Sequence, residues 1–161
     1  MGELATSAVA GDVLVSLGLG SCIGLALLDR RVGVAGLAHI VLPASSGAPA
    51  AGAYKFADVA VPELIERVVA AGGRRPMLEA AIVGGASMFA VSNGSMEVGV
   101  RNEAAVRDLL AAERINVIAA ETGGARGRTV RVHVGTSEVT VREAGGIEHV
   151  LVTSNPSVVA A

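Results

Sequence analysis

The sequence contains a single cysteine, Cys22, so no disulfide can form within the chain. Aromatic residues are also scarce, with two Phe, one Tyr and no Trp among 161 residues. This scarcity argues against a surface that binds nucleic-acid bases by stacking. Lys55 is the only lysine, and the Gly-Lys-Ser/Thr sequence of a phosphate-binding P-loop is missing. A disulfide framework is therefore excluded, and a P-loop nucleotide site is not expected.

Charge and hydropathy argue against two further classes of protein. The net charge is −2, and the arginines do not gather on one predicted helix face, so a nucleic-acid backbone is not an expected partner. The longest strongly apolar run, residues 13–28, is shorter than the ~20 residues that cross a bilayer and is interrupted by glycines. The N-terminal residues lack the pattern of a secretory signal. We expect no membrane insertion and a cytoplasmic location.

Aliphatic and small residues supply the core. Hydrophobic residues make up 52% of the chain and the mean hydropathy is +0.58, which suffices for a core without disulfides or metals. We expect one domain over residues 1–161, with its core at about 12–143 and short extensions at both ends. The three histidines show no zinc-ligand spacing with Cys22, so no metal or other cofactor is expected.

Short apolar runs separated by turns predict more strands than helices. The predicted strands cover residues 13–17, 23–28, 32–42, 78–89 and 115–124, and a hairpin covers 128–143. Helical periodicity occupies residues 56–73, and Asn102 is a candidate N-cap for a helix over 103–113. Because two helices cannot cover both faces of one broad sheet, we expect an α/β domain with two packed sheets and helices outside. The small-residue segment 43–54 predicts an exposed loop, either a lid or a connector.

The glycine-rich stretch SLGLGSC, residues 16–22, ends on the cysteine. It does not match the Gly-x-Gly-x-x-Gly dinucleotide fingerprint, because Gly24 falls one position late. Glycines here allow a ligand to approach the backbone closely, and the N–H groups near Gly20 and Ser21 could hold an oxyanion as a thiolate attacks a carbonyl.

A cysteine nucleophile needs a base, and His39 lies on the predicted strand that follows the Cys22 strand. The Ser16 hydroxyl is a candidate group for orienting the imidazole. Each residue also has a purely structural interpretation: Cys22 as an inert core thiol, His39 as a hydrogen-bonded core histidine, and Ser16 as a hydroxyl at a strand end. The spacing of these residues alone leaves both interpretations open.

Six motifs in order resemble the CheD family of chemoreceptor glutamine deamidases: LGLGSC (17–22), GLAHIVLP (36–43), KFAD (55–58), GGASMF (84–89), GVRN (99–102) and ETGGARGR (121–128). The resemblance implies an enzyme of chemotaxis that hydrolyses glutamine side-chain amides of receptors to glutamate and releases ammonia. It also implies a β-sandwich with flanking helices, layered α-β-β-α and similar to the catalytic domain of the cytotoxic necrotizing factor toxins. The receptors' cytoplasmic domains would be the substrate, and a CheC-type phosphatase a further partner.

The resemblance places the family's catalytic cysteine at Cys22 and its histidine at His39. The family's third position is a threonine, which is Ser16 here, so the hydroxyl is kept while the methyl group that restricts χ1 is absent. Residues 84–87, with Gly84, Gly85 and Ser87, either line the substrate cleft or form a tight structural turn. Another cysteine hydrolase and a non-catalytic adaptor stay as alternatives, although an adaptor would need neither Cys22 nor His39.

Overall fold

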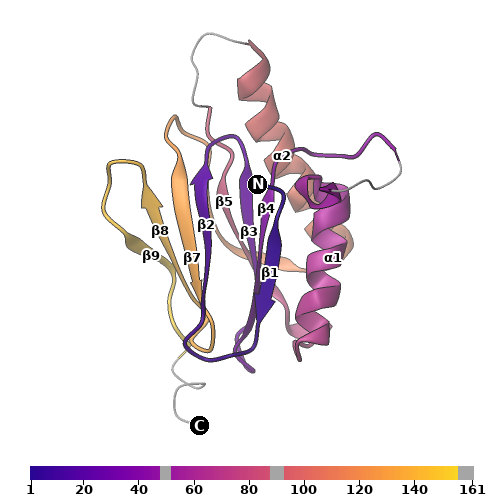
Figure 1. The fold of residues 1–161 in the computed structure, drawn as a ribbon, viewed down its shortest axis with the longest axis vertical. Coiled ribbons are helices and arrows are strands. Elements are labelled where there is room, and N and C mark those ends of the chain that lie inside the picture. The colour runs from indigo at the N-terminus through magenta and orange to yellow at the C-terminus, as the bar shows by residue number, and fades with distance from the viewer. Residues whose placement is uncertain (48–51, 88–92, 156–161) are drawn as a thin grey trace.

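The computed structural model describes residues 1–47, 52–87 and 93–155, and for residues 93–97 it describes the backbone only. Within these ranges, strands form two sheets (Figure 1). The first sheet has the order β1-β4-β3-β5-β6, and the second has the order β2-β7-β8-β9. The strands are β1 (Leu4–Ser7), β2 (Val13–Leu19), β3 (Ile23–Asp29), β4 (Val34–Ile40), β5 (Glu79–Gly84), β6 (Asn116–Thr122), β7 (Arg128–His133), β8 (Glu138–Glu143) and β9 (His149–Val152).

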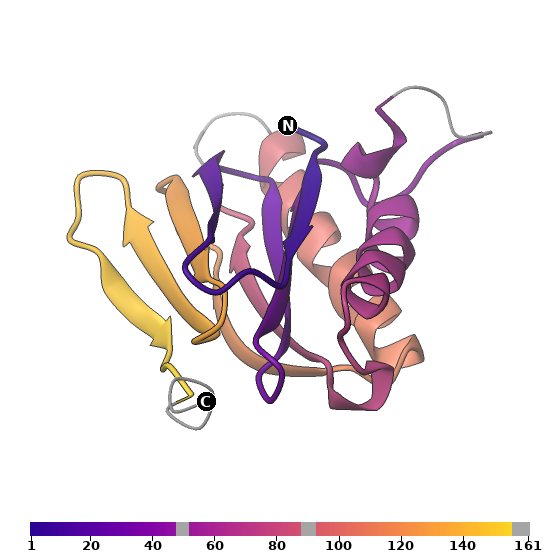
Figure 2. The same cartoon turned by 60° about the horizontal axis from the view of Figure 1, so that its bottom comes forward.

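Two α-helices, α1 (Ala57–Ala70) and α2 (Asn93–Ala112), cover the same face of the five-stranded sheet (Figures 1 and 2). The periodicity of α1 explains its orientation, because Val61, Leu64 and Val68 recur at helical spacing and all are buried against the sheet. The second helix connects β5 to β6, which pair in parallel and so need a long crossover. Short 3₁₀ turns, η1 (Ala53–Lys55) and η2 (Arg75–Met77), flank α1.

The other face of the five-stranded sheet packs against the four-stranded sheet. Strand β3 is buried along its whole length because its odd and even positions enter different cores. Leu25 and Leu27 pack under the helices, whereas Ala26 and Leu28 pack between the sheets. This double burial explains why its sequence is a continuous apolar run.

The two-sheet α/β architecture predicted from the sequence is confirmed, but the layer order differs. In the described ranges the order is α-β-β, since both helices lie on one side and the outer face of the four-stranded sheet carries no helix. The physical reason is visible in β7, where Val130 and Val132 are buried while Thr129, Arg131 and His133 alternate with them toward solvent. A polar outer face of this kind needs no helix to cover it.

Several predicted boundaries also change. The second helix begins well before the expected N-cap, so Asn102 lies inside α2 and is buried. Strands β1 and β9 lie outside the 12–143 range expected for the core and were not predicted. Residues 48–51 of the predicted loop and residues 88–89 of the predicted strand lie outside the described residues. Neither described helix is long and apolar enough to cross a membrane.

Candidate active site

The pairing of β3 with β4 brings the candidate nucleophile and base onto one face of the sheet. Gly24 of β3 pairs with His39 of β4, and Cys22 precedes Gly24 by two positions. Residues two apart on a strand share a face, and diagonal neighbours on paired strands lie within reach of each other. Cys22, 8% exposed, belongs to the core between the two sheets. Both side chains therefore belong to the inter-sheet side of the sheet.

Gly24 allows the second sheet to approach closely beside this pair. A Cβ atom at Gly24 would lie 2.7 Å from Leu19 Cδ1 and 3.1 Å from Val130 Cγ1, so no larger residue fits without displacing them. Leu19 lies at the end of β2, and the short turn 20–22 then crosses from the second sheet to the first. The nucleophile thus sits where the chain passes between the two sheets.

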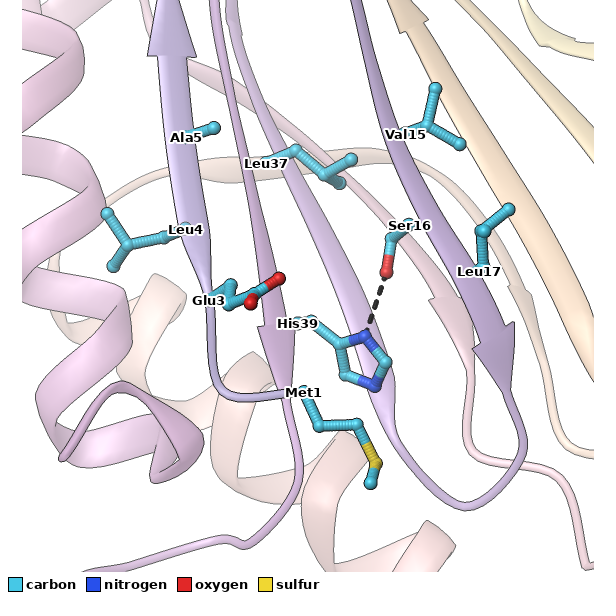
Figure 3. Close-up of a pocket in the computed structure, with 9 residues that line it drawn as sticks. All are labelled: Met1, Glu3, Leu4, Ala5, Val15, Ser16, Leu17, Leu37 and His39. Carbon is cyan, nitrogen blue, oxygen red and sulfur yellow. Dashed lines mark hydrogen bonds between the residues drawn. The ribbon is translucent and has the colours of Figure 1, made fainter. Parts of the chain in front are cut away.

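His39 is held from the opposite sheet by Ser16 of β2. The Ser16 Oγ and His39 Nδ1 atoms are 3.1 Å apart, and Ser16 is only 6% exposed (Figure 3). The second ring nitrogen of His39, Nε2, is buried and has no hydrogen-bond partner among the residues that the structure describes. When Nδ1 donates its hydrogen to Ser16 Oγ, Nε2 is left as a free acceptor for a proton.

A cavity of about 460 Å³ opens beside Ser16 and His39. It lies between β1 of one sheet and β2 of the other, each the edge strand of its sheet (Figure 3). The residues that line it are Met1, Glu3, Leu4, Ala5, Val15, Ser16, Leu17, Leu37 and His39. Cys22 is not in this lining. A cavity between two edge strands gives an external side chain a path toward the histidine.

Burial keeps both candidate catalytic groups uncharged. Burial raises the pKa of the Cys22 thiol, against the lowering effects of the Met1 amino charge and of the backbone N–H of Cys22. Burial also lowers the pKa of His39, as does the Met1 amino charge, against the raising effect of Glu3. At neutral pH Cys22 is therefore a thiol and His39 a neutral imidazole, which is a base able to accept a thiol proton.

The turn that carries Cys22 is fixed by backbone hydrogen bonds to the segment after β5. Gly85 N–H donates to Cys22 O at 2.8 Å, and Ala86 N–H donates to Gly20 O at 2.7 Å. Gly20 N–H is itself used in a turn with Gly18 O at 3.0 Å. Within the described ranges, the N–H groups of Ser21 and Cys22 donate to no backbone carbonyl. These two are the amides of the turn left to hold a developing oxyanion.

Gly84 has to be glycine for the supporting segment to come this close. Its φ is +114°, and a Cβ atom there would lie 2.2 Å from Cys22 O. Ser87 contributes through its backbone, since its N–H donates to Gly124 O at 2.8 Å. The contacts found for Gly84, Gly85 and Ser87 are thus backbone contacts that fix the nucleophile turn and its neighbour.

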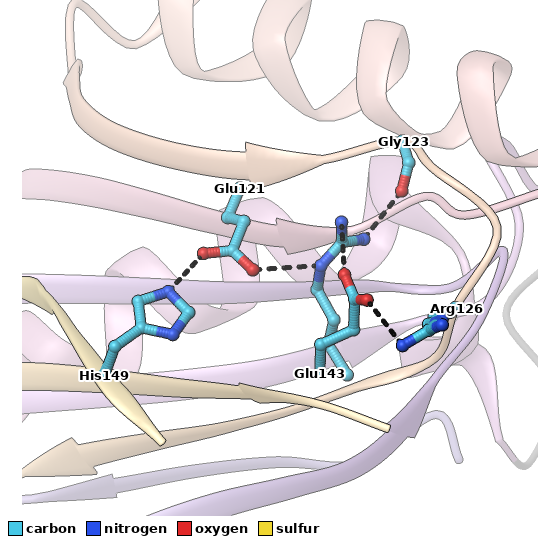
Figure 4. Close-up of polar contacts among 6 residues, drawn as sticks. Glu121, Gly123, Arg126, Glu143 and His149 are labelled. Atoms are coloured by element: carbon cyan, nitrogen blue, oxygen red, sulfur yellow. Dashed lines mark hydrogen bonds and ion pairs between the residues drawn. The ribbon is translucent and has the colours of Figure 1, made fainter. Parts of the chain in front are cut away.

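A charged cluster behind the site was not identified from the sequence, although the ETGGARGR motif contains its central members. Arg128 is nearly buried, and its Nε donates to Glu121 at 3.1 Å while Nη1 donates to Gly123 O at 2.7 Å (Figure 4). Gly123 N–H in turn donates to Gly84 O at 2.9 Å. His149 of β9 contacts Glu121 at 2.7 Å, and this hydrogen bond raises the pKa of His149. The cluster therefore connects β6, β7 and β9 to the Gly84–Gly85 segment, which in turn binds the carbonyl of Cys22.

Histidines other than His39 are remote from this arrangement or belong to the charged cluster. His133 lies on the outer side of β7, and His149 contacts Glu121. In the described ranges, no group of three or more His, Cys, Asp or Glu side chains is arranged to hold a metal ion.

Comparison with known proteins places this chain in a family. The sequence model of the CheD chemotactic sensory transduction family matches residues 41–143. Relatives named "Probable chemoreceptor glutamine deamidase CheD" occur in Clostridium botulinum (strain Eklund 17B), 45% identical over 135 residues, and in Methanococcus vannielii, 42% identical over 132 residues. A third, from Geobacillus kaustophilus, is 41% identical over 141 residues. The matches cover 82–84% of this chain and 83–86% of the relatives. The chain therefore belongs to the CheD family.

Proposed function

We propose that this chain is a chemoreceptor protein-glutamine deamidase that uses Cys22 as nucleophile and His39 as general acid and base. The observation that carries the proposal is the Ser16–His39 hydrogen bond between the two sheets, which leaves the buried Nε2 atom of a neutral, partly buried imidazole without a partner among the described residues, on the face that Cys22 shares. Membership of the CheD family supplies the substrate class, because relatives of the chain carry that activity in their names.

The first half of the reaction forms a thioester. His39 Nε2 takes the proton of the Cys22 thiol while sulfur attacks the carboxamide carbon of a receptor glutamine. The carbonyl oxygen becomes negative and is held by the free N–H groups of Ser21 and Cys22. The carbon–nitrogen bond then breaks, and His39 gives its proton to the departing nitrogen, which leaves as ammonia.

The second half of the reaction hydrolyses the thioester and regenerates the free Cys22 thiol. A water molecule attacks the thioester carbon, and His39 accepts one of its protons. The carbon–sulfur bond breaks, the proton passes back to the Cys22 sulfur, and the receptor side chain leaves as glutamate. Water supplies the oxygen of the new carboxyl group, so no cofactor takes part. Ser16 acts throughout by holding Nδ1, which keeps the ring turned toward the reaction.

The neighbouring residues have supporting roles in this scheme. Gly20 and Ser21 shape the oxyanion turn, since Gly20 is fixed by Ala86 N–H and by its own turn with Gly18. Gly84 and Gly85 support that turn from the β5 side, and Ser87 binds the neighbouring Gly124 carbonyl. In this scheme all three border the space in which the substrate amide binds.

Five wider features belong to the same proposal. Residues 1–161 act as one deamidase domain, located in the cytoplasm. Its sandwich corresponds to the catalytic domain of the cytotoxic necrotizing factor toxins, which the packing of two sheets with helices outside supports. The cytoplasmic domains of chemoreceptors are the substrate, and a CheC-type phosphatase is a further partner.

The test is mass analysis of a chemoreceptor cytoplasmic fragment incubated with the chain and, in parallel, with Cys22→Ala. A deamidated glutamine gains about 1 Da, and peptide mapping locates it. We expect conversion and ammonia release with the unsubstituted chain and neither with the variant. Methanol or a cleaved receptor chain would instead identify another hydrolase. An unmodified receptor that still binds the folded chain would identify an adaptor and contradict the proposal.

A further inference from the structure

Asn102 makes two hydrogen bonds that connect the elements carrying the two candidate catalytic side chains. Its Nδ2 donates to Ser21 O at 2.9 Å and to Val41 O at 2.8 Å. Ser21 directly precedes Cys22, and Val41 follows His39 by two residues. The orientation of the side-chain amide is fixed by these partners, because carbonyl oxygens only accept and the NH₂ group must face them. One side chain therefore ties the nucleophile turn to the end of the histidine strand.

The position of Asn102 is unfavourable for stability alone. It lies in the interior of α2 with 0% of its surface exposed, and its Oδ1 is buried without a hydrogen-bond partner in the described part of the chain. Asparagine is a poor residue for a helix interior, and an unpaired buried amide oxygen is destabilising. Aliphatic residues of similar size fit a buried helix face at lower cost. The side chain is thus explained by the two carbonyls it binds rather than by the helix that carries it.

The helix approaches the site closely enough for this contact because of Gly99, one turn before Asn102 on the same helix face. A Cβ atom at Gly99 would lie 2.6 Å from Gly85 O. The backbone of α2 therefore packs directly on the Gly84–Gly85 segment, which also binds the carbonyl of Cys22. Gly99 and Asn102 together bring one helix against both sides of the nucleophile turn.

The hydrogen bond from Asn102 to Ser21 O also sets the direction of the Cys22 N–H, because the peptide unit between these two residues is planar and trans. The C=O of Ser21 and the N–H of Cys22 belong to the same peptide unit and point in opposite directions. Holding the oxygen toward α2 therefore directs the N–H away from the helix and toward the thiol, where it favours the thiolate. Among the described residues the same N–H donates to no backbone carbonyl, and it is one of the two amides proposed to hold the oxyanion.

We infer that Asn102 is a positioning residue for catalysis: by holding the carbonyls of Ser21 and Val41, it fixes the direction of the Cys22 N–H and the separation of the nucleophile turn from the histidine strand. The inference rests on the proposed function for its link to deamidation. Its effect on the Cys22 thiol, however, exists without any substrate.

The experiment compares Asn102→Leu, which removes both donors at similar volume, with Asp29→Asn, which breaks a buried polar contact at the opposite end of β3. Cys22 alkylation by iodoacetamide is followed across pH, with Cys22→Ala as the blank. We expect alkylation of Asn102→Leu at neutral pH to fall about tenfold, because losing the oriented N–H raises the thiol pKa by about one unit. Asp29→Asn should alkylate as the unsubstituted chain does.

Deamidation of the receptor fragment gives the second readout. For Asn102→Leu we expect kcat to fall at least about tenfold while KM stays within about twofold, since substrate contacts are kept. If this variant does not fold, Asn102→Ser keeps one donor and should show a smaller change of the same kind. An unchanged alkylation profile and kcat in the folded variant, or equal losses in Asp29→Asn, would overturn the inference. A shifted alkylation profile without any deamidation by the unsubstituted chain would contradict the proposed function and leave the control of the thiol standing.

Discussion

Strand β3 has a buried or partly buried polar group at each end, and the Asp29 carboxylate at one end and the His39 imidazole beside the other differ in how they are paired. At its C-terminal end, Asp29 is fully buried, and both of its carboxylate oxygens are paired. Arg74 donates from Nε and Nη2 at 2.8 Å and from its backbone N–H at 3.0 Å, and Arg31 N–H adds a fourth bond at 3.1 Å. This end of the strand is fastened to the segment after α1.

The N-terminal end, beside Cys22, leaves polar atoms unpaired. His39 Nε2 and Asn102 Oδ1 are buried, and neither has a hydrogen-bond partner within residues 1–47, 52–87 and 93–155. Buried polar atoms are normally paired, and exceptions tend to mark sites kept for a reaction. The hydrogen bonds of the Asp29 carboxylate to Arg74 therefore stabilise the fold, whereas the Nε2 atom of His39 is available for proton transfer. Substitutions at the two ends should therefore change different measurable properties.

After the complete loss expected for Cys22→Ala, the largest effect should follow from His39→Gln. Glutamine keeps a polar side chain of similar size but cannot exchange a proton, so kcat should fall by about 10²–10⁴, the range for a lost general base. Ammonia release from a receptor fragment measures this rate, and the thermal midpoint should change little. A variant that is folded and retains near-normal kcat would show that another group is the base.

Asp29→Asn should do the reverse and reduce stability without reducing the rate. The amide cannot match four donors and leaves the Arg74 charge unpaired. Because Arg74 is 44% exposed, we expect a loss of about 3 kcal/mol in the free energy of unfolding, the low end for breaking a buried ion pair. Urea unfolding measures the loss, and kcat per folded molecule should be unchanged. A lower kcat in the fully folded variant would contradict a role for Asp29 in stability alone.

As the pH falls, His39 should be protonated before Asp29. Burial lowers the pKa of His39, so the base is lost, and the rate falls about tenfold per pH unit, only below the ordinary histidine value of about 6.5. Unfolded chains take up protons at this histidine first, so stability also declines through that window. Burial alone would raise the pKa of Asp29, but its bonds to Arg74 and Arg31 hold it below its ordinary value. Its stabilisation is thus full above the unfolded pKa of about 3.9 and is lost as pH falls through the folded value.

Rate and stability profiles across pH, measured on the unsubstituted chain and on Asp29→Asn, separate these two titrations. The variant should keep the acid limb of kcat/KM and lose the steep decline of stability below about pH 4. An acid limb above pH 6.5 would contradict a buried, neutral His39.

The smallest effect should come from Ser16. Ser16→Ala removes one neutral hydrogen bond to His39 Nδ1, so we expect kcat to fall about fivefold, the equivalent of about 1 kcal/mol. Ser16→Thr restores a methyl group that restricts χ1 and should leave kcat equal or slightly higher. Comparing the two variants by ammonia release checks the role of the hydroxyl. Equal rates in both would remove Ser16 from the mechanism.

The candidate catalytic residues were accessible from the sequence because local patterns carry them. Residues 13–17 and 23–28 gave apolar runs around a glycine turn, and His39 fell on the next run, so neighbouring strands followed from chain order. The resemblance to a family then assigned roles to Cys22, His39 and Ser16. The confirmed part of the fold, two packed sheets with two helices, rested on the same apolar periodicity.

Features that depend on long-range contacts could not be predicted in this way. Asn102 matched an N-cap by type, but the two carbonyls it binds lie 81 and 61 residues away in the chain. The pairing of Arg128 with Glu121 and Gly123 depends on how β6 and β7 meet. Strand β1 is short and only partly buried, so its four residues give little periodic signal.

The assignment of catalysis to the Cys22 end of β3 is tested most directly by measuring ammonia release and the thermal midpoint for Cys22→Ala, Asp29→Asn and the unsubstituted chain. One receptor fragment serves as the substrate for all three. We expect Cys22→Ala to release no ammonia while its thermal midpoint is unchanged. We expect Asp29→Asn to have a lower thermal midpoint while its rate of ammonia release per folded molecule is unchanged. Ammonia release by Cys22→Ala, or a lost rate in folded Asp29→Asn, would contradict the assignment of catalysis to the Cys22 end of β3.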